Sequence, residues 1–342
     1  MCASVLNVQV IVRKMVKKKA LLVGCNYPGQ DNELVGCCND ARRLCTLLKT
    51  RFGFPGENID VLVDDNPGTD QSTHANIRKY LEKLVGDVQS GDILVFSFSG
   101  HGKLLGRSND NTGWNEAIFP NDLTNPLTDD DFRAIVNKIP AGVTFTFLSD
   151  SCCSGGLIDE LKEQVGGAEG GKNSMQQIRR VYAGQRGLPL SMLIGQLNNS
   201  GLNFTVDESN FLTAIYEKHE GNASITVTSQ QPIKAACKKD DVGILLSGCE
   251  SWELSIDEHG DDPPNTAHGV FTKAIETVVC RSSKSPSNKE MTNAVRQLIQ
   301  SDWDQTAPLL DDDGKEVKDG PQHPCLYCSD GNADKVFICD FV

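Results

Sequence analysis

The chain has 342 residues, of which 39% are hydrophobic and 23% are charged, as expected for one large or two moderate globular domains. Acidic residues outnumber basic residues by 46 to 33, which gives a net charge of −13. This charge argues against nucleic acid as a partner and favours basic peptides. No apolar stretch reaches the length of a membrane span, so we expect no membrane partner.

Cysteine usage and the N-terminal residues bear on the cellular compartment. Thirteen cysteines are an odd number, and their scatter does not resemble a disulfide framework, which favours a reducing compartment. Near the N-terminus the apolar residues precede the basic ones, the reverse of the order in a signal peptide. We therefore expect a cytoplasmic location, with the nucleus as a second candidate, and a monomeric protein.

The first half of the chain alternates between predicted strands and predicted helices. The strands are short apolar runs rich in branched residues, and the helices repeat apolar residues every three or four positions. This alternation predicts an α/β fold with a mostly parallel sheet and helices on both faces. The predicted strands span 20–25, 59–63, 93–98, 117–119 and 143–148, and the predicted helices span 39–50, 75–88 and 129–137.

The second half begins with a change of composition near residue 165. Glycine and polar residues dominate up to about residue 241 and predict a surface linker with short helices at 192–197 and 211–218. Order resumes with strands at 243–247 and 326–328 and helices at 269–279 and 289–301. The predicted regions are an N-terminal extension (1–16), a large catalytic region (17–165), a linker (166–241) and a small region (242–342).

Two strand ends carry residues suited to nucleophilic chemistry. The sequence VTFTFLSDSCCSGG at 143–156 ends a buried strand with Cys152 and Cys153, and ILVFSFS at 93–99 leads directly into Gly-His101-Gly. Buried thiols are common in cores, so the cysteines alone favour a structural role. A thiol becomes a nucleophile when an imidazole lies beside it, and ligand sites of parallel sheets lie beyond the carboxyl ends of the strands. The 51-residue separation between His101 and Cys152 matches the spacing in caspases.

Taken together, SFSGHG and SDSCCSGG resemble the histidine and cysteine motifs of the caspase-like clan, and the flanking sequence resembles the type II metacaspases of plants. The resemblance runs from about Lys17 to the end of the chain. It implies a caspase-like fold and a cysteine endopeptidase in which His101 and Cys152 form the catalytic dyad. The backbone N–H groups of Gly102 and Cys152 are then expected to bind the oxyanion. Further matching segments are KKALLVGCNYPG (18–29), ELVGCCND (33–40), LTDDDFR (127–133), GLIDELKEQVG (156–166), GILLSGC (243–249) and HPCLYCSD (323–330).

The same resemblance implies a pocket for a basic residue. Asp40 and Asp150 match the carboxylates that line the first specificity pocket of metacaspases, and paired carboxylates select Arg or Lys before the scissile bond. Without the resemblance, Asp40 is typical of an acid at a helix N-terminus. Cys153 occupies a variable position of the motif, and it is either a bystander or a redox partner of Cys152.

Members of this family separate their large and small subunits by self-cleavage in the linker. Arg186, in GQRGLP, lies where a related processing site falls, and the following glycine and proline predict an extended, accessible segment. The chain is therefore expected to be a zymogen. A surface arginine is more often simply solvated. Competing basic sites in the linker are Lys172, Arg179 and Arg180.

Calcium dependence remains open at the level of the sequence. Some type II metacaspases need Ca²⁺ and bind it with an acidic loop after the histidine motif, whereas others are independent of it. Here that loop reads RSNDNTGWNE, with Asp110 and Glu116 as its only acids. Calcium prefers several oxygen ligands that include carboxylates, so weak or absent dependence is expected. No cofactor is required for the chemistry itself.

Other interpretations of single motifs are weaker. Gly100-x-Gly102 lacks the third glycine of a dinucleotide fingerprint, and Cys325 and Cys328 with His323 lack a second ligand pair for zinc. A cysteine-dependent phosphatase would need an arginine shortly after Cys152, and none follows up to Glu163. The alternative from another functional class is a caspase-fold protein that acts by binding, with little or no proteolysis.

Overall fold

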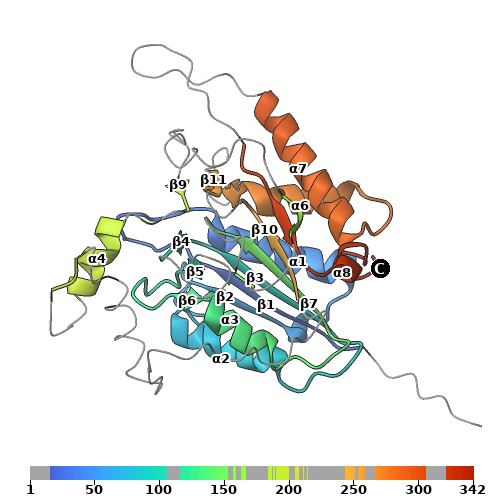
Figure 1. Ribbon diagram of the computed structural model, residues 1–342, viewed down its shortest axis with the longest axis horizontal. Helices are drawn as coiled ribbons and strands as arrows, with labels where there is room; N and C mark the ends of the chain where they lie inside the picture. Colours follow the sequence, from blue (N-terminus) through green and yellow to red (C-terminus); the bar gives the residue numbers. More distant parts are fainter. Residues whose placement is uncertain are drawn as a thin grey trace, which may run out of the picture.

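The computed structural model describes the greater part of the chain. The described residues are 16–105, 116–152, 157–158, 163–166, 184–186, 188, 190–199, 205–207, 211, 214, 243–250, 253–258, 266–305 and 321–342. They form a central sheet covered by helices on both faces (Figure 1). No helix within these ranges combines the length and the apolar character needed to cross a membrane.

The central sheet has seven strands in the order β2-β1-β3-β7-β10-β13-β8. Neighbours among the first five strands run parallel, and β13 runs antiparallel to both of its neighbours. This arrangement confirms the predicted α/β class with a mostly parallel sheet. The strands are β1 (Lys18–Gly24), β2 (Ile59–Val63), β3 (Ile93–Ser99), β7 (Thr144–Asp150), β8 (Glu163–Val165), β10 (Ile244–Ser247) and β13 (Cys325–Tyr327).

Each face of the sheet has its own apolar core. Along β1, Leu21 and Val23 face one core while Ala20 and Leu22 face the other, because successive strand side chains point to opposite faces. Strands buried on both faces read as continuous apolar runs, which is why β1 and β3 were recognisable in the sequence. Helices α2 (His74–Val85) and α3 (Asp129–Val136) cover the first core, and α1 (Cys37–Phe52), α6 (Val270–Arg281) and α7 (Asn288–Asp304) cover the second.

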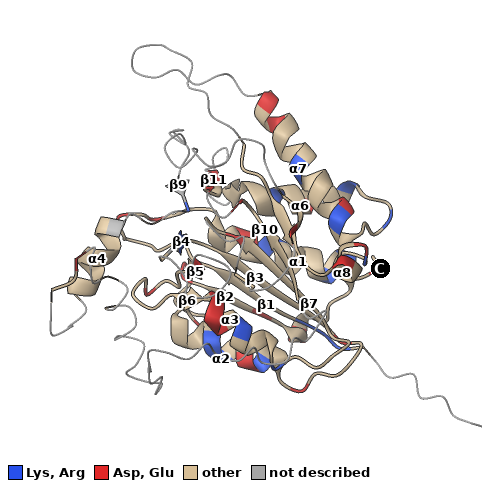
Figure 2. Cartoon of the chain, in the orientation of Figure 1, with Lys and Arg blue, Asp and Glu red and all other residues tan. Residues whose placement is uncertain are grey.

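Local capping explains where several helices begin and end. Ser287 and Glu290 form a reciprocal capping box at the start of α7, and the Thr73 side chain accepts a hydrogen bond from Asn76 N–H at the start of α2. Gly53 ends α1 in the left-handed conformation. Figure 2 shows most charged residues on the helices and few on the central strands, as the burial of the sheet requires.

Two small sheets lie beside the central one and frame its carboxyl edge. One consists of β4 (Gly102–Leu104), β5 (Glu116–Ile118) and β6 (Leu127–Thr128). The other has the order β12-β11-β9 and joins the linker to the small region. Its strands are β9 (Gly184–Gln185), β11 (Ile256–Glu258) and β12 (His268–Gly269), and the remaining elements are η1 (Gly56–Asn58), α4 (Leu190–Asn198) and α8 (Asp330–Ala333).

Candidate active site

The predicted histidine and cysteine follow two neighbouring strands. β3 and β7 pair in parallel with Ser99 opposite Asp150. His101 and Cys152 each lie two residues beyond these partners, so both reach the same carboxyl edge of the sheet. The chain packs so closely here that a Cβ atom at Gly102 would overlap the carbonyl oxygen of Cys152. The structure thus brings the two predicted motifs together, and only glycine fits between them.

His101 is fully buried, and a backbone carbonyl fixes its ring. Its Nε2 lies 2.7 Å from the carbonyl oxygen of Asn32, which can only accept, so Nε2 carries the hydrogen. The other ring nitrogen, Nδ1, has no hydrogen-bond partner in the part of the chain that the structure describes. Burial lowers the pKa of His101 to about 4, although contacts with the backbones of Asn32 and Arg186 partly oppose this. The ring is therefore neutral near pH 7 and can accept a proton at Nδ1.

Tyr27 supports the imidazole from one side. The two rings stack with their centroids 4.5 Å apart and an angle of 27° between their planes. The Tyr27 hydroxyl accepts a 2.8 Å hydrogen bond from the His101 backbone N–H and donates one of 2.5 Å to the carbonyl of Phe119. The sequence analysis did not single out Tyr27, although it lies within the matching segment 18–29.

Cys152 lies two residues beyond the end of β7, and its thiol is buried. The sulfur accepts a 3.1 Å hydrogen bond from the backbone N–H of Ser255, in the segment that leads into β11. The same sulfur lies 3.8 Å from the carbonyl oxygen of Ser255, so the Ser255 backbone offers it both a donor and an acceptor. Cys153 lies outside the described residues, so its role stays a prediction.

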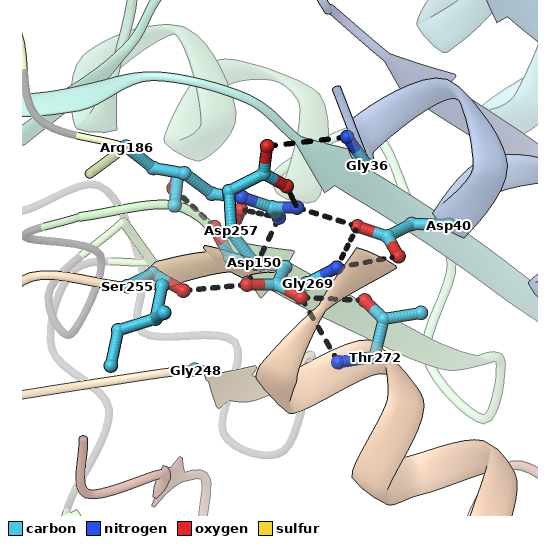
Figure 3. A network of polar contacts seen from close by, with 12 residues as sticks. Gly36, Asp40, Asp150, Arg186, Gly248, Ser255, Asp257, Gly269 and Thr272 are labelled. Atoms are coloured by element: carbon cyan, nitrogen blue, oxygen red, sulfur yellow. Dashed lines mark hydrogen bonds and ion pairs between the residues drawn. The ribbon is translucent and has the colours of Figure 1, made fainter. Parts of the chain in front are cut away.

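The predicted pocket acids converge on the linker arginine (Figure 3). Nη2 of Arg186 lies 2.7 Å from Oδ2 of Asp40 and 2.8 Å from Oδ1 of Asp257. Nη1 lies 2.7 Å from the carbonyl oxygen of Asp150 and 3.0 Å from its Oδ1. All four side chains are buried. The expectation of an accessible Arg186 was wrong, because its guanidinium is enclosed by charge partners instead of water.

Additional donors satisfy the pocket carboxylates. Asp40 accepts hydrogen bonds from Gly269 N–H, and Asp150 accepts them from the Ser255 hydroxyl and from the backbone and side chain of Thr272. Burial raises the pKa of Asp40 to about 7, while the charge of Arg186 acts in the opposite direction. Burial disfavours the charge on Arg186, but the nearby acids raise its pKa well above the ordinary value. The pocket is therefore built for a cation, which offsets the repulsion among its acids.

The backbone that leads into Arg186 forms an edge strand paired with β11. Gly184 and Gln185 pair antiparallel with Asp257 and Ile256 of β11. The pairing continues through Arg186, whose N–H donates to the carbonyl of Ser255 at 3.2 Å. The carbonyl oxygen of Arg186 accepts a 2.9 Å hydrogen bond from Gly102 N–H, one of the two predicted oxyanion donors. The linker thus presents a peptide to the predicted dyad in extended form.

Sequence reasoning missed Asp257. No element was predicted between the strand at 243–247 and the helix at 269–279, whereas Ile256–Glu258 forms β11 and carries Asp257 into the pocket. The short alternation of apolar and polar residues in LSID was the available signal. Among the other candidates, Glu116 is buried in β5 and His323 Nδ1 contacts Glu253 Oε1 at 2.6 Å. Lys172, Arg179, Arg180 and Asp110 lie outside the described residues.

Comparison with known proteins agrees with this geometry. Residues 18–161 match the family model for the metacaspase, peptidase C14 domain. Over 336 residues the chain is 36% identical to metacaspase-9 of Arabidopsis thaliana, covering 95% of this chain and 98% of that protein. Metacaspase-6 of the same plant is 32% identical, with coverage of 94% and 100%.

A solved structure supports the fold independently. Protein GSU0716 from Geobacter sulfurreducens superposes with a TM-score of 0.59 at 20% identity, covering 94% of this chain and 98% of that one. This similarity concerns the fold alone. The sequence relatives lead to one assignment: the chain belongs to the metacaspase family of caspase-like peptidases and is a cysteine endopeptidase.

Proposed function

We propose that this endopeptidase cleaves after arginine or lysine by a Cys152–His101 dyad, and that it is made as a zymogen that cuts itself after Arg186. The observation that carries the proposal is the position of Arg186. Its guanidinium contacts three carboxylates. Its backbone continues the pairing of β9 with β11, and its carbonyl oxygen accepts a hydrogen bond from Gly102 N–H. A bound substrate with a basic residue before the scissile bond would make the same set of contacts.

The chemistry follows from the hydrogen-bond roles in the site. Nδ1 of His101 takes the thiol proton of Cys152, because Nε2 is committed to Asn32. The thiolate attacks the carbonyl carbon, and the Gly102 N–H, with that of Cys152, stabilises the negative charge that develops on oxygen. His101 then gives its proton to the leaving amine, which leaves a thioester on Cys152. Water, activated by the same imidazole, hydrolyses the thioester and restores the thiol.

The pocket favours arginine over lysine. Two guanidinium nitrogens contact Asp40, Asp150 and Asp257 at the same time, over distances of 2.7 to 3.0 Å. A lysine ammonium is a single point of charge and cannot span the same carboxylates in one geometry. The overall acidity of the chain adds a general attraction for basic protein substrates. An aspartate in this pocket would meet like charges.

Hydrolysis of short fluorogenic peptides tests the proposal. We expect turnover of a peptide ending in Arg, slower turnover of its Lys analogue and none of its Asp analogue, with the Cys152→Ala variant as the inactive control. Parallel reactions with Ca²⁺ and with a chelator settle calcium dependence, since residues 106–115 of the acidic loop lie outside the described ranges. Hydrolysis of none of the peptides would favour the binding-protein alternative, and cleavage after Asp would refute the pocket assignment.

A further inference from the structure

A single carboxylate connects the arginine pocket to the loop that orients His101. Oδ1 of Asp257 contacts the guanidinium of Arg186 at 2.8 Å. Oδ2 of the same side chain accepts hydrogen bonds from the backbone N–H groups of Val35 at 2.8 Å and Gly36 at 3.2 Å. Figure 3 shows Asp257 between Arg186 and Gly36. Asp40 and Asp150 contact the same guanidinium, but no hydrogen bond in the described part of the chain joins either carboxylate to Val35 or Gly36.

Val35 and Gly36 end the loop that carries Asn32, here called the 26–36 loop. Hydrogen bonds of Asn26 join its two ends. The backbone carbonyl of Asn26 accepts from Leu34 N–H at 2.8 Å, and its side-chain Nδ2 lies 3.4 Å from the backbone carbonyl oxygen of Val35. Within the loop, Glu33 N–H donates to the carbonyl of Gln30 at 3.1 Å. The loop is therefore closed on itself, and a displacement at residues 35–36 is passed to Asn32.

Asn32 is the point at which this loop meets the imidazole. Its carbonyl oxygen is the acceptor for Nε2–H of His101, at 2.7 Å. That hydrogen bond decides which ring nitrogen is free to act as base. A shift of about 1 Å in such a contact is enough to lower a catalytic rate by a large factor.

We propose that Asp257 is a positioning residue that joins recognition of the basic side chain to the orientation of His101. The proposal rests on the proposed function, because it takes Arg186 as the stand-in for a substrate residue. A guanidinium in the pocket anchors one carboxylate oxygen, and the other oxygen then holds the end of the 26–36 loop. Gly36 is part of this device, since a Cβ atom there would overlap Oδ1 of Asp257.

Nuclear magnetic resonance of the intact full-length chain tests this independently of turnover. In a Cys152→Ala background with ¹⁵N-labelled histidine, the Nε2–H proton of His101 should be shifted downfield and protected from exchange, and His101→Gln identifies it. We expect Asp257→Ala to remove this signal or to speed its exchange about tenfold or more. Asp257→Asn should have an intermediate effect, because its amide oxygen can still accept from Val35 and Gly36 while its NH₂ group cannot accept from the guanidinium of Arg186.

Asp40→Ala is the matched control, because it removes a pocket carboxylate that does not contact the 26–36 loop. We expect it to keep the His101 signal. Loss of the signal in both alanine variants would overturn the proposal in favour of a general disturbance of the pocket. Retention of the signal in Asp257→Ala with unchanged exchange would overturn it as well.

A second measurement changes the pocket residue Arg186 and observes the loop. It does not require the Asp257→Ala variant to fold. In the same background, Arg186→Gln leaves Asp257 without its cationic partner. We expect the amide protons of Val35 and Gly36 to exchange several-fold faster than in the parent, and unchanged exchange at both would refute the link. Peptide hydrolysis tests the proposed function separately. An enzyme that hydrolyses Arg peptides but shows unchanged exchange at Val35 and Gly36 would refute this inference and leave the proposed function intact.

Discussion

The backbone N–H of Gly102 donates a 2.9 Å hydrogen bond to the carbonyl oxygen of Arg186, directly beside the backbone of Cys152. The same arginine fills a pocket of three acids, so its side chain and its carbonyl are fixed together. In an enzyme that cleaves after basic residues, this carbonyl belongs to the bond that is cut. On the proposed function, Arg186 would therefore occupy the active site until the linker is cut.

Replacing Arg186 should stop self-cleavage of the linker. We expect Arg186→Gln to remain one full-length chain, Arg186→Lys to be cut more slowly, and Arg180→Gln, the matched control, to be cut like the parent. Denaturing gels and mass spectrometry of the products check this. Cleavage of Arg186→Gln at the same peptide bond would contradict the pocket assignment.

The same glutamine variant should also be less stable. Removing the cation leaves three buried carboxylates without their shared partner, which costs about 3–5 kcal/mol for a broken buried ion pair before protonation of Asp40 relieves part of it. Thermal unfolding of Cys152→Ala chains with and without Arg186→Gln measures the loss. An unchanged midpoint would contradict a stabilising role for the guanidinium of Arg186 in the pocket.

The two adjacent thiols should behave differently. Cys152→Ala is expected to abolish self-cleavage and peptide hydrolysis, because Cys152 is the residue beside Gly102 and Ser255 N–H. Cys153→Ala should still process itself. Inactivity of Cys153→Ala alone would show that the wrong thiol was named.

Much of the fold was readable from the sequence because the central strands are buried on both faces. Ile59–Val63 was predicted at its observed bounds, β3 begins at the predicted residue and ends one residue later, and β1 and β7 differ from their predicted ranges by one or two residues at each end. Among the shortest strands, β5 and β13 were predicted to within one residue, whereas β9, β11 and β12 were missed. These three strands are too short for a clear periodic pattern, and they are defined by pairing with one another.

The site was predictable to the extent that local motifs define it. His101, Cys152, Asp40 and Asp150 lie at strand or helix ends that the pattern already marked, and the parallel sheet brings those ends together. Asp257 and Asn32 could not be found this way. Asp257 acts through β11, whose position depends on contacts across more than 200 residues, and Asn32 acts through a backbone carbonyl that any residue could supply.

Gly102 should be intolerant of any side chain. A Cβ atom would overlap the carbonyl oxygen of Cys152, so Gly102→Ala must displace either the cysteine or the N–H that contacts Arg186. Loss of one oxyanion donor lowers kcat by about 10²–10³-fold. Gly195→Ala in α4 is the control, because its added methyl meets no atom within 4 Å. Steady-state hydrolysis of an Arg peptide by both variants measures the effect. Parental activity in Gly102→Ala would show that the Gly102 N–H is not an oxyanion donor.

Burial of neutral His101 should make stability depend on pH in a defined direction. Its pKa is about 4 in the folded protein and near 6.5 when unfolded, so between these values the unfolded chain binds more protons. The free energy of unfolding should therefore fall on acidification through this window, with His101 contributing a loss of about 2 kcal/mol between pH 7.5 and pH 5. Urea unfolding of Cys152→Ala at several pH values measures the slope. The additional variant His101→Gln, whose amide can still donate to Asn32, should lose that part of the slope, and an equal slope in both proteins would mean that His101 is already protonated in the folded state.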